Sequence, residues 1–183
     1  MTARVGGLVG TVFAVGVVAF AVAGCGSVGE SGRSFSVESV GPAKTVSPAV
    51  DQTRAELVRV LAAQSLVLSN TQTPVRKAES PLMAAASRAI YQVVLPKDPN
   101  KGYIVVYEFT DLGLAAAAAA EQQAYLGTGP GRVQTPQGTV TLIRQVGSTV
   151  VLYDWLPAAA QDPSAAGIQA ALEGLGVGFP VAN

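Results

Sequence analysis

Two runs of strand-forming apolar residues constrain the fold of this chain more than any other feature. Residues 103–109 are Tyr-Ile-Val-Val-Tyr-Glu-Phe, and residues 149–155 are Thr-Val-Val-Leu-Tyr-Asp-Trp. A strand that is apolar at nearly every position is typical of the centre of a sheet, where both of its faces are covered. We therefore expect these two segments to be central strands, with Val105 and Val151 in the core.

Each apolar run follows another strand-like segment and precedes a helix-like one. The further strands are predicted over 89–95 and 139–145, the helices over 49–63, 111–126 and 164–175, and a glycine-rich surface connector over 127–132. The sequence thus predicts an α+β domain with a largely antiparallel sheet of about four strands and helices on one face. The element order is α-ββα-ββα, which is similar in style to ferredoxin-like folds.

The N-terminus has the layout of a secretory signal. Arg4 supplies a positive charge, and residues 5–22 carry no charged side chain. A cationic start followed by an apolar stretch partitions into the bilayer with its positive end on the cytoplasmic side. The alternative is an uncleaved transmembrane helix, since the stretch could just span a bilayer at ~1.5 Å per residue. Its several glycines weaken that alternative.

The segment Val22-Ala23-Gly24-Cys25 ends this stretch and resembles the lipobox of bacterial lipoproteins. The resemblance implies that Cys25 carries a thioether-linked diacylglycerol and that cleavage precedes it. Residues 1–24 would then be a signal peptide, 25–48 a lipidated flexible tether and 49–183 a single domain. The expected location is the extracytoplasmic face of a bacterial membrane, held by acyl chains. The remaining chain resembles small uncharacterised envelope lipoproteins, a likeness that implies no particular activity.

Composition narrows the possible functions. The chain has no histidine and one cysteine, so histidine-based catalysis, histidine metal sites and internal disulfides are ruled out. Twelve basic and 12 acidic residues give no basic footprint for nucleic acid. The acidic residues form no calcium-like cluster. We expect no metal, no cofactor and no nucleic-acid partner.

Four residues near predicted strand ends are candidates for a surface or ligand site. Glu108 and Asp154 could form a carboxylate pair, with Arg144 as a charge partner, and Trp155 is the aromatic residue expected to be most exposed. The competing interpretation is that these side chains are simply solvated or paired where strands leave the core.

A lysine base is disfavoured, because a catalytic lysine must be desolvated. The lysines beyond the signal, Lys44, Lys77, Lys97 and Lys101, lie in polar, loop-like segments. The favoured hypothesis is a non-catalytic binding or accessory module that contacts an envelope protein. The alternatives are a small-ligand binder or sensor and, third, a carboxylate-dependent enzyme. A pocket with convergent polar groups would favour the alternatives over the accessory module.

Overall fold

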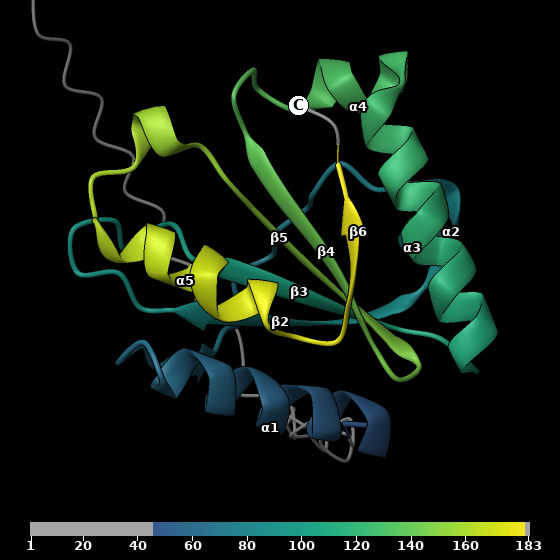
Figure 1. The fold of residues 1–183 in the computed structure, drawn as a ribbon, viewed down its shortest axis with the longest axis horizontal. Coiled ribbons are helices and arrows are strands. Elements are labelled where there is room, and N and C mark those ends of the chain that lie inside the picture. Colours follow the sequence, from purple (N-terminus) through teal and green to yellow (C-terminus); the bar gives the residue numbers. More distant parts are fainter. Residues whose placement is uncertain (1–45, 182–183) are drawn as a thin grey trace, which may run out of the picture. The chain divides into compact units, whose positions relative to one another are not determined.

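The computed structural model describes residues 46–181, and a six-stranded antiparallel sheet of order β1-β2-β3-β5-β4-β6 forms its centre (Figure 1). The strands are β1 (Leu68–Asn70), β2 (Ser87–Val93), β3 (Tyr103–Glu108), β4 (Val140–Val146), β5 (Thr149–Trp155) and β6 (Val177–Pro180). The helices are α1 (Pro48–Ala62), α2 (Pro81–Ala85), α3 (Leu112–Gly127), α4 (Gly129–Gln134) and α5 (Ser164–Glu173), with a 3-10 turn η1 at Pro157–Ala159.

Strands β3 and β5 pair with each other at the centre of the sheet, as their apolar sequences predict. Val106 lies opposite Val151, and Val105 lies opposite Leu152. All three of these valines are fully buried. Because successive strand residues point to opposite faces, burial at consecutive positions requires cover on both sides of the sheet.

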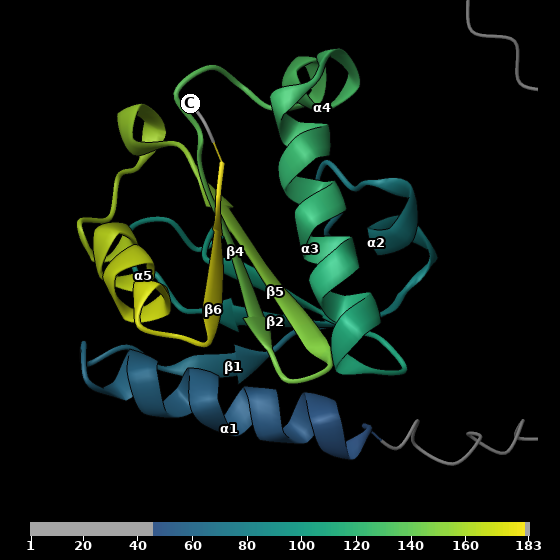
Figure 2. The ribbon, with the colours of Figure 1, turned by 45° about the vertical axis from the view of Figure 1, so that its right-hand side comes forward.

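Helices α1 and α5 cover the first face (Figure 2). Ser47 caps α1, and the buried Leu57 and Leu61 of α1 join Ile168 and Leu172 of α5 in one hydrophobic cluster. Residues 3, 4 or 7 positions apart share one side of a helix, which explains this apolar stripe. The cluster is completed by residues of β2, β3 and β5.

Helix α3 covers the opposite face. The carboxylate of Asp111 caps it by accepting a hydrogen bond of 2.8 Å from the backbone N–H of Leu114. The fully buried Ala115, Ala118 and Ala119 pack against strand residues of a second hydrophobic cluster. Alanine has the highest helix propensity and its small side chain allows close packing on the sheet, so the alanine run suits this position.

The α+β class and the antiparallel sheet are confirmed, but two details of the predicted fold are wrong. The sheet has six strands rather than about four, and helices cover both faces rather than one. The added strands β1 and β6 lie at the two edges, and each is too short to show a periodic pattern. The predicted surface connector over 127–132 runs into the short helix α4, whose residues are exposed apart from Gly131.

The expectations for the signal, Cys25 and most of the tether fall outside the described residues. The last residue assigned to the tether, Pro48, already opens α1. None of the helices within residues 46–181 has the length and apolar character needed to cross a membrane.

Candidate ligand pocket

The structure does not bring Glu108 and Asp154 together. Glu108 is the last residue of β3 and pairs with Thr149, the first residue of β5. Asp154 lies near the other end of β5, opposite Thr141 of β4. Since β3 and β5 run antiparallel, the two carboxylates lie toward opposite ends of these strands, and they cannot act as a pair.

Arg144 contacts backbone carbonyls just after the C-terminal end of α5, and it does not contact a carboxylate among the described residues. Its guanidinium donates hydrogen bonds to the backbone carbonyls of Leu175 and Gly176, just after the last turn of that helix. A cation near the C-terminal end of a helix interacts favourably with the helix dipole. Arg144 therefore has a structural role at the turn into β6.

Asp154 and Trp155 line a pocket of about 420 Å³ where β5 ends and β3 begins. Its walls come from residues within four segments, 74–77, 95–103, 136–139 and 153–160, and from Ala165 of α5. Most lining side chains are apolar, and Arg76, Lys77, Asp98, Lys101 and Asp154 supply charge. The volume falls within the range of small-ligand sites.

Lys77 is the charged group buried most deeply in this pocket wall. It forms an ion pair with Asp154, and the side chains of Lys77 and Asp154 are 10% and 31% exposed. Burial, and secondarily repulsion from Lys101, lower the pKa of Lys77 to about 8. Both causes penalise the charged ammonium. The expectation that Lys77 is a solvated loop lysine is therefore wrong.

The 71–80 loop carries Lys77 into place because α3 holds the loop against the sheet. The side-chain amide of Gln122, which is fully buried in α3, accepts from the N–H of Ser80 at 2.7 Å and donates to the carbonyl of Ala78 at 2.6 Å. The neighbouring Glu121 accepts from the N–H of Leu82 at 3.0 Å. These contacts satisfy loop backbone groups that burial would otherwise leave without partners.

Two loops close the pocket on the other side through reciprocal aspartate contacts. Asp98 accepts hydrogen bonds from the backbone N–H groups of Gln161 and Asp162, at 2.6 and 3.2 Å. Asp162 in turn accepts from the N–H of Lys97 at 3.0 Å. The hydrogen bonds from the N–H groups of Lys97 and Ser164 lower the pKa of Asp162. The loops are thus fixed to each other.

Trp155 forms an aromatic wall of the pocket together with Tyr103. It is half-buried, like Tyr103 and Tyr125, and its ring packs against the cluster of the α1–α5 face. Its indole N–H donates to the side-chain oxygen of Gln169 at 3.0 Å. This bond fixes the orientation of the ring beside the pocket.

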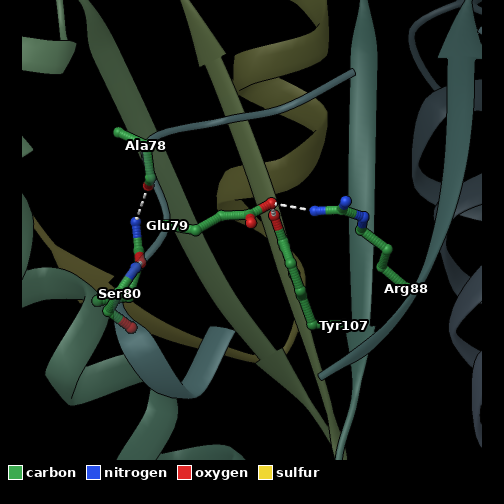
Figure 3. Close-up of polar contacts among 6 residues, drawn as sticks. Ala78, Glu79, Ser80, Arg88 and Tyr107 are labelled. Carbon is green, nitrogen blue, oxygen red and sulfur yellow. Dashed lines mark hydrogen bonds and ion pairs between the residues drawn. The ribbon is translucent and has the colours of Figure 1, made fainter. Parts of the chain in front are cut away.

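A second buried charge lies in the same loop, two residues beyond Lys77. One carboxylate oxygen of Glu79 accepts hydrogen bonds from the hydroxyl of Tyr107 at 2.7 Å and from the guanidinium of Arg88 at 2.5 Å (Figure 3). The three side chains converge from the loop, β3 and β2. Burial first, and the bond to Glu79 second, raise the pKa of Tyr107 well above its usual value. None of the three residues lines the pocket of Lys77.

Sequence reasoning found two of the pocket residues, Asp154 and Trp155, and missed Lys77. The segment around Lys77 has the polar composition of a solvated loop, and no sequence signal marks its burial. Within residues 46–181, no group of three or more carboxylates lies together as a metal site would require.

Comparison with known proteins gives no match to a family model, to a curated protein or to a solved structure.

Proposed function

We propose that this protein is a lipid-anchored, extracytoplasmic binding module that takes a small organic ligand in the pocket between Lys77 and Trp155. The observation that carries the proposal is the pocket itself, which combines about 420 Å³ of space with a buried ion pair and an oriented aromatic wall. Pockets that bind small molecules are mostly apolar, with a few polar groups fixed in position.

The pocket favours small-ligand binding over the accessory-module hypothesis, which would be supported by a filled core and a flat or grooved surface. It also favours binding over catalysis. The protonated ammonium of Lys77 has three donors and no lone pair, and it contacts one oxygen of Asp154. A general base must instead have a free lone pair within reach of the proton that it removes.

The anchor is a separate part of the proposal and rests on the lipobox resemblance at Cys25. Two or three acyl chains give stable attachment, because each buried methylene contributes about 0.8 kcal/mol. Cys25→Ala should yield an unprocessed precursor that incorporates no labelled fatty acid. Normal maturation of this variant, or continued acyl labelling, would disprove lipidation at Cys25.

Ligand binding can be followed through Trp155, the single tryptophan of the chain. The full chain in detergent would be titrated with neutral, anionic and cationic aromatic compounds, and tryptophan emission would be recorded. We expect a saturable change with at least one class, since Trp155 lines the pocket.

Two phenylalanine variants of η1 test whether the change in Trp155 emission comes from binding in this pocket. Ala159→Phe should abolish the change, because Ala159 is exposed and lines the pocket, where the larger side chain would occupy ligand space. The neighbouring Ala158 does not line the pocket, so Ala158→Phe is the matched control and should keep the change. Absence of saturation with every class, or equal effects of the two variants, would refute ligand binding in this pocket. An envelope protein captured equally by both variants would then favour the accessory module.

A further inference from the structure

The acidic side chains of the pocket have partners, whereas two of its basic side chains do not have an acidic partner among the described residues. Both of its carboxylates are engaged, since Asp154 contacts Lys77 and Asp98 accepts two backbone hydrogen bonds. The two cations of the pocket other than Lys77 have no such partner in the described part of the chain. Within residues 46–181, neither Arg76 nor Lys101 has a carboxylate oxygen within 4.0 Å of its charged nitrogen atoms. The pocket therefore presents two positive charges that no described acidic side chain neutralises.

The positive groups also act on one another. Lys101 is the second cause of the lowered pKa of Lys77, which means that the two ammonium groups are near enough to repel. A negative charge placed between them would relieve that repulsion and would be favoured by both. Arg76 adds a planar guanidinium, which suits carboxylate and phosphate oxygens.

The apolar side of the pocket indicates the rest of the ligand. Trp155, Leu156 and Tyr103 line it together with Ala159 of η1, and the indole of Trp155 is held in orientation by Gln169. An aromatic or aliphatic group packed there would bury apolar surface on both partners. The pocket thus offers a charged end and an apolar end.

We infer that the pocket is selective for an organic anion, whose carboxylate or phosphate contacts Arg76 and Lys101 and whose apolar body packs against Trp155. The inference rests on the proposed function, because it assigns a ligand class to the same pocket. An N-acyl aromatic amino acid has the required form, with one carboxylate and one ring.

The test compares a carboxylate with its neutral amide, two probes that differ in charge and little in size, and adds a phosphate as a second anion. N-acetylphenylalanine, N-acetylphenylalaninamide and phenyl phosphate would be titrated into the full chain in detergent, with Trp155 emission excited at a wavelength that phenylalanine does not absorb. Charge-assisted hydrogen bonds are worth more than neutral ones, so we expect the carboxylate to bind at least about tenfold tighter than the amide. Phenyl phosphate distinguishes the two anion types, and tighter binding of either anion supports the inference.

Arg76→Gln and Lys101→Gln should each reduce the preference for anions over the amide, and the double variant should remove it. Lys97→Gln is the matched control, because Lys97 lies on the same loop as Lys101 but does not line the pocket. Its preference should stay that of the unaltered protein.

Two failures can be told apart. If the amide binds as tightly as both anions, or if the double variant keeps the preference, then anion selectivity is wrong while the pocket remains a ligand site. If neither the probes nor the wider compound panel saturate the Trp155 signal, then the inference and the proposed function are both wrong.

Discussion

Lys77 and Glu79 are two charges of opposite sign that enter the protein from the same loop, and their surroundings differ. Glu79 has two donors on one oxygen, from Tyr107 and Arg88, and its side chain is 9% exposed. Lys77 is buried to a similar degree, 10% exposed, but it has a single carboxylate partner and lines an open pocket.

The difference shows how burial alone misleads as a sign of function. Burying a charge costs free energy unless partners replace water, so each of these residues must be compensated locally. Around Glu79 the compensation comes from Tyr107 and Arg88, on two paired strands. None of these three residues lines the pocket, and we call them the closed cluster. Around Lys77 the compensation is shared with a cavity, and further positive charges remain at the edge. We therefore assign Glu79 to structure and Lys77 to the ligand site.

The largest expected effect tests the closed cluster. Glu79→Ala should lower the free energy of unfolding by about 3 kcal/mol, because it leaves the buried hydroxyl of Tyr107 and the guanidinium of Arg88 without an acceptor. Denaturant unfolding would measure the change. Glu108→Ala is the control, since Glu108 is a carboxylate at a strand end with no ion pair among the described residues, and it should cost less than about 0.5 kcal/mol. Equal costs for the two variants would contradict the structural role of Glu79.

The next prediction concerns the pH dependence of stability that Lys77 contributes in the pocket. The pKa of Lys77 in the folded protein is about 8, whereas a lysine in the unfolded chain has its ordinary pKa of 10.5. The unfolded state therefore binds more protons between these values, so this residue should raise the free energy of unfolding by about 1 to 2 kcal/mol from pH 8 to pH 9.5. The charged groups around Lys77 in the pocket wall are Asp154, Lys101, Arg76 and Asp98.

Two methionine variants isolate this contribution. Lys77→Met should flatten the rise, while Lys97→Met, on an exposed loop, should retain it. Differences between variants cancel the contribution of the tyrosines, and the range ends below the pKa values of Tyr107 and Tyr153, which burial raises. A rise that persists in Lys77→Met would mean that this lysine is not the desolvated group.

A smaller effect comes from removing one donor of the closed cluster. Tyr107→Phe should cost about 1 kcal/mol, because Glu79 keeps its contact with Arg88 and no buried polar atom is left on the ring. Tyr153→Phe is the matched control, since that buried hydroxyl makes a long contact of 3.5 Å with the carbonyl of Ala165. Thermal unfolding should show a greater loss for Tyr107→Phe. The reverse order would place the more important hydroxyl at Tyr153.

The smallest expected effect is the stability cost of removing the two exposed cations of the pocket. Arg76→Ala and Lys101→Ala should each change the free energy of unfolding by less than about 0.5 kcal/mol, since both side chains are exposed and make no described ion pair. Denaturant unfolding at neutral pH would measure this. A loss near that of Glu79→Ala would make these cations part of the structural framework rather than groups available to a ligand.

Much of the fold could be predicted, because local patterns carry it. The strand over residues 149–155 has the bounds of β5, and α1 and α3 begin within one residue of the predicted positions. Long helices and strands bury one or both faces, and the spacing of their apolar residues in the sequence predicts that burial. The edge strands β1 and β6 were missed, since three or four residues are too few for a pattern and their pairing partners are distant.

For the candidate site, the sequence predicted some of the residues and not others. Asp154 and Trp155 could be found because polar or aromatic residues at the end of a central strand often reach an open edge. Glu108 and Arg144 satisfied the same criterion, yet the antiparallel pairing of β3 with β5 sends Glu108 to the other end, and Arg144 contacts the end of α5. Strand direction decides which ends meet, and that is not a local property.

The sequence by itself determined the two central strands, the helix stripes that cover them and the absence of histidine chemistry. It also carries a segment that resembles a lipobox, from which anchoring at Cys25 is predicted. Only the tertiary structure decided which face each helix covers and where the 71–80 loop goes. That loop is held by Gln122 of α3, more than 40 residues away, and this contact buries Lys77 and Glu79. The environment of a charge depends on all the atoms around it, so its pKa and its partners are set by the assembled fold rather than by its neighbours in the chain.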